Sequence, residues 1–112
     1  MIFKIATAAD WAEAERVGHF DGSAHDKADG FLHFSTGPQL AETMRLYYAR
    51  QDGLVLAAVD AAALGAALKW EHAPSRGEDF PHLFGPLPLS AVKWTHRLMR
   101  DAGGTAILPD LA

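Results

Sequence analysis

The stretch LVLAAV at residues 54–59 is an unbroken apolar run, and Asp52-Gly53 directly precedes it. A strand covered on both faces shows such a continuous run, whereas a strand with one solvent face alternates. We therefore expect a central, fully buried strand at this place. Residues 2–6 form a second short apolar run, and it is interpreted as another buried strand.

Two helices are expected between these two strands in the sequence. Thr7, followed by Asp10 three residues later, resembles a capping box, so a helix should begin there and end near Gly18. A second helix is expected over residues 36–49, with Thr36 as its cap. The apolar positions of this second helix follow the helical period, and they are Leu40, Met44, Tyr47 and Tyr48.

The remaining segments divide into turns and short strands. Residues 19–30 (HFDGSAHDKADG) are rich in turn formers and are interpreted as a polar loop long enough to carry function. Residues 68–72 and 92–99 alternate and are expected to be strands. The prolines and glycines of residues 72–88 should interrupt regular structure there. Together these signals predict a single α+β domain spanning residues 1–112.

The composition excludes several classes of protein. With 49% hydrophobic and 21% charged residues the chain should fold as an ordinary globular domain. The net charge of −4 makes nucleic acid an unlikely partner. The absence of cysteine excludes disulfides, thiolate metal sites and a cysteine nucleophile. No signal peptide and no membrane-spanning run is recognised, so a cytoplasmic protein without a membrane partner is expected.

Three residues stand out as candidates for catalysis. Residues 31–35 should form a strand in which His33 and Ser35 share one face, opposite Leu32 and Phe34. Glu71 follows Trp70, and apolar surroundings there would suit it to acid–base work. His82 lies in FPHLFGPL, where prolines and aromatic residues should hold an imidazole in place. The alternative for His33 is a structural role as a hydrogen-bonded histidine, and the alternative for Glu71 is a solvated strand carboxylate.

Other kinds of site are poorly supported. The chain has six histidines but no HExxH helical pair, so no metal site is expected. None of the serines lies in a GxSxG motif, and neither a GxGxxG nor a Walker-type loop is present.

The strings DGFLHFSTGPQLAETM (29–44), LKWE (68–71) and FPHLFGPLPLSAV (80–92) closely resemble the bacterial family catalogued as domain of unknown function 952. That family is grouped by similarity with the ADP-ribosyltransferase fold. The resemblance implies two small, mostly antiparallel sheets with a central cleft and two to three helices. It also implies NAD, or another nucleotide, as a small-molecule ligand in that cleft.

The resemblance assigns roles to particular residues. His33 and Ser35 would position the nicotinamide ribose, and Glu71 or His82 would act as base or electrostatic stabiliser. Residues expected to border the ligand or the cleft entrance are Lys4, His25, Asp26, Asp29 and Gly85. The chain departs from the transferase pattern, because Lys4 replaces the usual Arg or His and no glutamate stands in the final motif.

Two alternatives remain open at this point. A non-catalytic module that binds a small molecule or a protein would keep the fold without transfer chemistry. A small hydrolase or isomerase would need His33 and Glu71 to converge on one substrate.

Overall fold

The computed structural model describes residues 1–111, which form an α+β domain of small antiparallel sheets. The α-helices are α1 (Ala8–Val17), α2 (Ala24–Asp29) and α3 (Leu40–Tyr47), and the 3-10 helices are η1 (Ala61–Ala67) and η2 (Leu89–Ala91). The strands are β1 (Ile2–Thr7), β2 (His19–Phe20), β3 (Leu32–His33), β4 (Leu54–Val59), β5 (Leu68–Ala73), β6 (Glu78–Leu83), β7 (Leu87–Pro88), β8 (Val92–Arg97), β9 (Met99–Arg100) and β10 (Ala106–Ile107). No helix in this part of the chain is long and apolar enough to cross a membrane.

The central sheet has the order β1-β4-β8, and β4 runs antiparallel to both neighbours. Leu54, Leu56 and Ala58 pack into one apolar cluster, which also contains residues of α3. Ala57 and Val59, which point the other way, pack into a second cluster with residues of α1 and β2. The prediction of a central strand covered on both faces is therefore confirmed.

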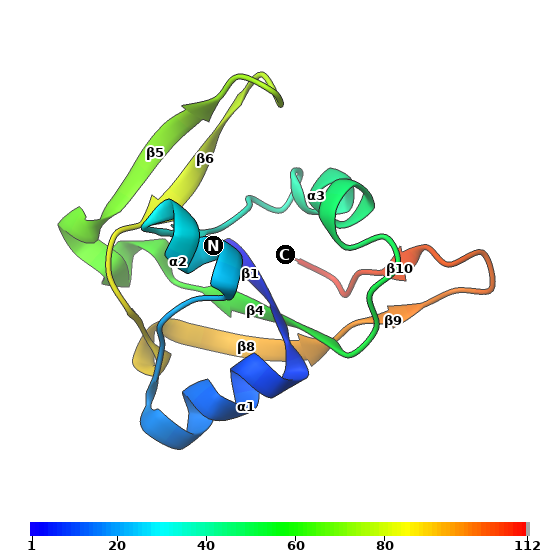
Figure 1. The fold of residues 1–112 in the computed structure, drawn as a ribbon, viewed down its shortest axis with the longest axis horizontal. Helices are drawn as coiled ribbons and strands as arrows, with labels where there is room; N and C mark the ends of the chain where they lie inside the picture. The colour runs from blue at the N-terminus through cyan, green and yellow to red at the C-terminus, as the bar shows by residue number, and fades with distance from the viewer. Residues whose placement is uncertain (112) are drawn as a thin grey trace.

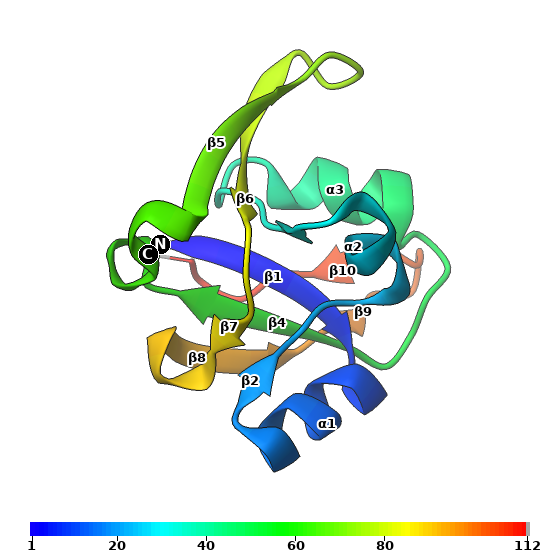
Figure 2. The same ribbon diagram turned by 60° about the vertical axis from the view of Figure 1, so that its left-hand side comes forward.

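A second sheet, with the order β3-β6-β5, carries the candidate residues. It joins the central sheet through a bridge between Phe3 and Ser35, whose backbone N–H and carbonyl groups bond reciprocally at 2.8 and 2.9 Å. Figures 1 and 2 show the β5–β6 hairpin standing away from the central sheet, with α1 at the opposite end of the molecule. This junction sets the position of His33, two residues before Ser35.

The first helix follows its local signals. The Thr7 hydroxyl accepts a hydrogen bond from the Asp10 N–H at 3.1 Å, and α1 starts at the next residue after Thr7. Gly18 ends the helix with φ +93°, a left-handed conformation that favours glycine. Both predicted ends are therefore confirmed, and Trp11 and Ala14 are the buried residues of the helix.

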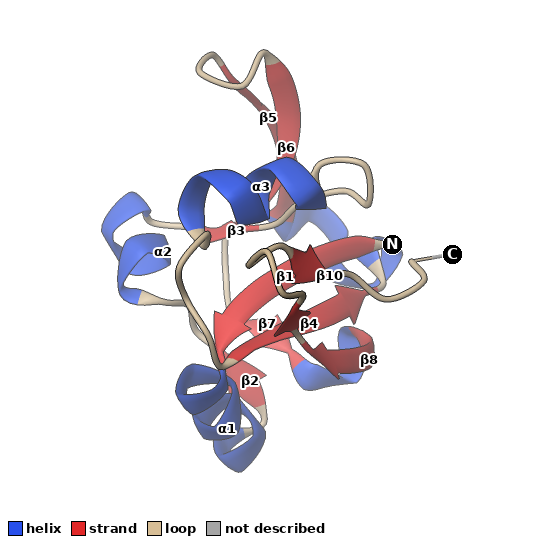
Figure 3. Ribbon diagram, turned by 90° about the vertical axis from the view of Figure 1, so that its right-hand side faces the viewer, coloured by secondary structure: helices blue, strands red, loops and turns tan. Residues whose placement is uncertain are grey.

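The second predicted helix is shorter than expected. It begins at Leu40, and Thr36 does not cap it. The Gln39 side chain instead accepts a hydrogen bond from the Thr36 N–H at 3.0 Å, and this closes a turn before the helix. Leu40 and Met44 are buried in the cluster shared with β4 and the C-terminal segment, and Figure 3 shows α3 on the same side of the central sheet as β10.

The polar segment at residues 19–30 is not a loop, so that interpretation was wrong. It holds β2, whose Phe20 is buried, and α2. A capping box starts α2: the Ser23 hydroxyl accepts from the Asp26 N–H, and the Asp26 carboxylate accepts from the Ser23 N–H. The same residue types that favour turns also favour helix caps, which explains the error.

Residues 72–88 are also more regular than predicted. After a turn, β6 continues through Pro81 in the middle of its sheet. The Pro81 carbonyl accepts a hydrogen bond from the Phe34 N–H at 3.0 Å, so proline keeps its acceptor although it lacks a donor. Within residues 72–88 regular structure is interrupted by the turn at residues 74–77 and again after Leu83.

Candidate functional site

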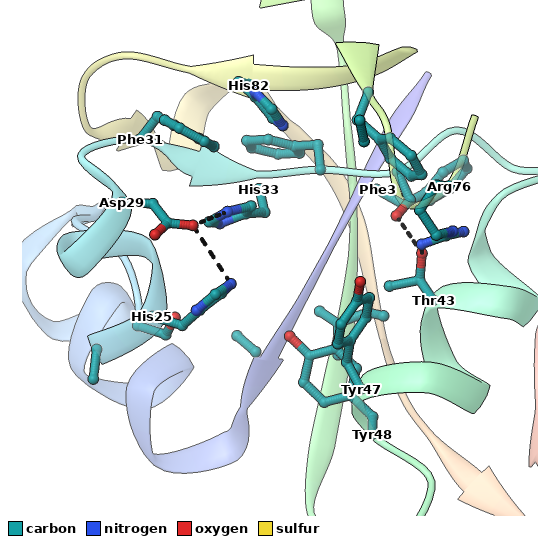
Figure 4. Close-up of a pocket in the computed structure, with 18 of the residues that line it drawn as sticks. Phe3, His25, Asp29, Phe31, His33, Thr43, Tyr47, Tyr48, Arg76 and His82 are labelled. Atoms are coloured by element: carbon teal, nitrogen blue, oxygen red, sulfur yellow. Dashed lines mark hydrogen bonds and ion pairs between the residues drawn. The ribbon is translucent and has the colours of Figure 1, made fainter. Parts of the chain in front are cut away.

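A cavity of about 680 Å³ opens between α2, the second sheet and α3. This volume lies within the range of small-molecule sites, about 300–1,000 Å³. Figure 4 shows His25, Asp29 and His33 along one wall, and Thr43, Tyr47, Tyr48 and Arg76 along the opposite wall. The cavity therefore has one wall rich in imidazole and one that carries a guanidinium and two phenols.

Behind the imidazole wall, Lys4, Asp26 and His33 form a buried ionic network. The Lys4 ammonium lies 2.8 Å from one Asp26 carboxylate oxygen and 3.0 Å from the other, and it also donates to the His33 carbonyl at 2.8 Å. The Lys4 and Asp26 side chains are 3% and 1% exposed. His33 completes the network through its backbone N–H, at 3.1 Å from Asp26 Oδ1, and its ring Nδ1, at 2.6 Å.

This network keeps the Asp26 carboxylate ionised. Burial by itself raises the pKa of the Asp26 carboxyl, but the hydrogen bond from His33 and the Lys4 ammonium outweigh burial and hold that pKa well below its usual range. Burial lowers the pKa of the Lys4 ammonium, and the Asp26 carboxylate opposes that shift. Asp26 thus serves as a fixed negative charge that orients the His33 ring.

The His33 ring lies between two carboxylates. Nδ1 contacts Asp26, while Nε2 lies 2.9 Å from Asp29 Oδ2. His25 stacks on His33 with ring centroids 4.6 Å apart, and its Nε2 lies 3.7 Å from the same Asp29 oxygen. A carboxylate oxygen only accepts, so His33 makes both bonds as a donor when its two ring nitrogens each carry a proton.

A second imidazole–carboxylate pair lies beside the first. His82 Nδ1 contacts Glu71 Oε1 at 2.7 Å, a diagonal contact between β6 and β5. Phe31 stacks on His82 with centroids 4.1 Å apart, and the His33 and His82 rings are 5.6 Å apart. The pairing of His33 with His82 across β3 and β6 holds the two rings on one face of the sheet.

The opposite wall offers a cation and hydroxyl groups. Arg76 donates to the Thr43 hydroxyl at 3.1 Å, and its guanidinium carbon lies 4.6 Å from the centroid of the Phe80 ring. Among the described lining residues, Arg76 is the only lysine or arginine. Burial, and to a lesser extent the Asp26 carboxylate, raises the pKa of the Tyr48 phenol. This phenol therefore stays protonated as a hydrogen-bond donor at neutral pH.

The structure brings most of the predicted residues into the lining of this cavity, and the others lie behind or outside the lining. Those that line the cavity are His25, Asp29, His33, Ser35 and His82. Lys4 and Asp26 lie behind His33, so Asp26 does not border the entrance and Lys4 faces its buried partners. Glu71 lies behind His82, and Gly85 is outside the lining.

The environment expected for Glu71 is not present. Trp70 is 52% exposed, and neighbouring residues of a strand point to opposite faces, so its ring does not enclose Glu71. The Glu71 side chain is itself 44% exposed. Its role is to hold the His82 ring.

Sequence reasoning missed the opposite wall and one group on the imidazole wall. Thr43, Tyr48 and Arg76 come from α3, the residue after it and the β5–β6 turn, and no local motif marks them. His25, Asp29 and His33 were each singled out, but their four-residue spacing was not read as one group. Once residues 24–29 are known to be helical, that spacing places His25 and Asp29 on one helix face.

The structure is a small α+β domain with a histidine-lined cavity. The chain matches the family model described as "Protein of unknown function (DUF952)" over residues 5–95. The crystal structure of protein CC0527 from Caulobacter crescentus is similar, with a TM-score of 0.89 and 45% sequence identity over 95% of this chain and 92% of that chain. The solution structure of CC0527 gives a TM-score of 0.82 and 47% identity over 92% and 88%.

The family match covers most of the chain, so this protein belongs to the DUF952 family. The comparison with curated proteins gave no significant match. The predicted resemblance to this family is confirmed.

Proposed function

We propose that this domain binds a nucleotide in the cavity beside His33 and His82, with NAD as the first candidate ligand. The observation that carries the proposal is the convergence of two carboxylate-held imidazoles, 5.6 Å apart, on one cavity of about 680 Å³. Flat aromatic groups such as Phe31 and Phe80 lie in the same lining and suit stacking on a base or a nicotinamide ring. Arg76 supplies the positive charge that a pyrophosphate requires.

The candidate activity is ADP-ribosyl transfer, and its support is the grouping of the DUF952 family with the ADP-ribosyltransferase fold. In that reaction the bond between nicotinamide and the ribose C1′ breaks, and the acceptor nucleophile bonds to C1′ and loses a proton. We assign His33 and Ser35 to the ribose, and His82 to the acceptor proton. Glu71 orients His82, since it holds Nδ1 and leaves Nε2 for proton transfer.

A specific observation favours the second candidate, a non-catalytic module that binds the same ligand. A transferase needs a free carboxylate at the ribose. Glu71 is engaged by His82 and does not line the cavity, and the Lys4 ammonium is directed to Asp26 and the His33 carbonyl.

The test is a titration of NAD followed by backbone amide NMR, combined with an assay of nicotinamide release. Binding should shift amides of residues 31–35 and 80–83, and His82→Ala should abolish release. His96→Ala is the matched control, because His96 lies on β8 outside the cavity. Shifts without release would identify the binding module, and shifts confined to other surfaces would contradict both candidates.

A further inference from the structure

His25, Asp29 and His33 form a group of potential metal ligands at the α2 end of the cavity. One ligand atom from each residue lies within 4.8 Å of the other two. All three residues line the cavity. We propose that this group is a binding site for one divalent transition-metal ion, of the zinc or iron(II) type.

The distances between the ligand atoms lie close to those expected around one metal ion. Bond lengths of about 2.0–2.1 Å at a tetrahedral ion separate two ligand atoms by about 3.3 Å. The Asp29 Oδ2 atom lies 2.9 Å from His33 Nε2 and 3.7 Å from His25 Nε2, so the two distances bracket that value. The His25 side chain is 73% exposed, and a rotation of its ring completes the geometry.

Asp26 prepares His33 for this role. Its Oδ1 atom lies 2.6 Å from His33 Nδ1, and the Lys4 ammonium fixes the carboxylate from behind. A proton on Nδ1 then leaves the lone pair of Nε2 directed at Asp29. A carboxylate that orients a ligating histidine through its other nitrogen is a recurrent feature of zinc sites. An ion bound there would be coordinated by this lone pair and by the Asp29 carboxylate.

The donor set selects the kind of ion. Two imidazoles with one carboxylate suit Zn²⁺ and Fe²⁺, whereas Mg²⁺ and Ca²⁺ prefer oxygen ligands. Three protein ligands leave further coordination positions for water or for a ligand oxygen. Because the three ligands line the cavity, those positions face the space in which the proposed nucleotide binds. The metal site does not depend on that proposal.

The test uses untagged full-length protein stripped of metal with EDTA. Isothermal titration with Zn²⁺ should give one saturable site, and Co²⁺ should give visible d–d absorption. His25→Ala and Asp29→Asn should each weaken Zn²⁺ binding by more than about 100-fold, the upper end of the loss seen when only an outer hydrogen-bond partner is removed. His19→Ala is the matched control, because His19 and Asp21 form a similar exposed pair at 2.7 Å outside the cavity, and it should leave the affinity unchanged.

The results separate clearly. The absence of a saturable site, or equal Zn²⁺ affinity in His25→Ala and the wild type, would overturn the proposal. Binding of Ca²⁺ as tightly as Zn²⁺ would overturn the assignment to a transition metal. Circular dichroism of both variants, whose side chains are on the surface of α2, checks that they fold. No nucleotide is used in this experiment, so a failure to bind metal does not contradict the proposed nucleotide binding. A failure to bind NAD likewise does not contradict the metal site.

Discussion

Removing Asp26 should destabilise the protein strongly, because it leaves a buried ammonium without its counter-ion. Lys4 is 3% exposed, and Asp26→Asn leaves its ammonium with neutral partners only, the introduced side-chain amide and the His33 carbonyl, among the described contacts. Breaking a buried ion pair by removing one partner costs about 3–5 kcal/mol. That is a large share of the roughly 5–15 kcal/mol by which a domain is stable.

Removing Lys4 should cost less than removing Asp26. In Lys4→Met the Asp26 carboxylate keeps the His33 ring and the N–H groups of Ser23 and His33 as donors. The double variant removes both charges, so its loss of stability should be smaller than the sum of the single losses. We expect a coupling free energy of about 2–3 kcal/mol, the upper part of the range for residues in contact.

The assay is equilibrium urea unfolding of the wild type, both single variants and the double variant. Tryptophan fluorescence and far-ultraviolet circular dichroism should give coincident transitions with similar m-values. The reasoning would be refuted if each single variant lost less than about 1 kcal/mol and the effects added to within about 0.5 kcal/mol. Such a result would mean that the pair is solvated and does not hold His33 in place.

Two further predictions concern stability. Burial raises the pKa of the Asp26 carboxyl, but His33 and Lys4 lower that pKa by more than burial raises it. The pKa in the folded state therefore lies below the unfolded value of about 3.9. Asp26 then stabilises the fold above that pH and loses this effect as the pH falls towards the folded pKa. The difference in unfolding free energy between wild type and Asp26→Asn, measured in EDTA, should therefore shrink from pH 7 to pH 3, and a constant difference would contradict this. Leu56→Ala in the central strand should cost about 2–5 kcal/mol, since Leu56 is fully buried, and a loss below 1 kcal/mol in urea unfolding would argue against the two-sided core.

Local signals were enough to predict the framework of the fold. The apolar run of β4 and the cap residues Thr7 and Gly18 each determine structure through their immediate neighbours in the chain. These predictions held because the physical cause lies within a few residues. The helix at residues 24–29 was missed because Ser and Asp favour both turns and caps, and only the burial of Asp26 decides between them.

The candidate site was only partly predictable, because its contacts join distant segments. His33 and His82 were recognised as candidates, but their pairing depends on the register between β3 and β6. Lys4 and Asp26 are 22 residues apart, and no pattern in the sequence shows that they meet behind His33. Arg76 enters the cavity from a turn whose position depends on the hairpin. Periodicity predicts the face on which a residue lies, but not its partner.

The central claim is that the imidazoles of His33 and His82, each held by a carboxylate, contact the same bound ligand. The most direct measurement follows the ring nitrogen resonances of His33 and His82 by ¹⁵N NMR during a titration with NAD. We predict that both rings shift along one binding isotherm, while the His96 ring does not move. Shifts of neither ring, or two isotherms with different dissociation constants, would contradict the claim that the rings share a site.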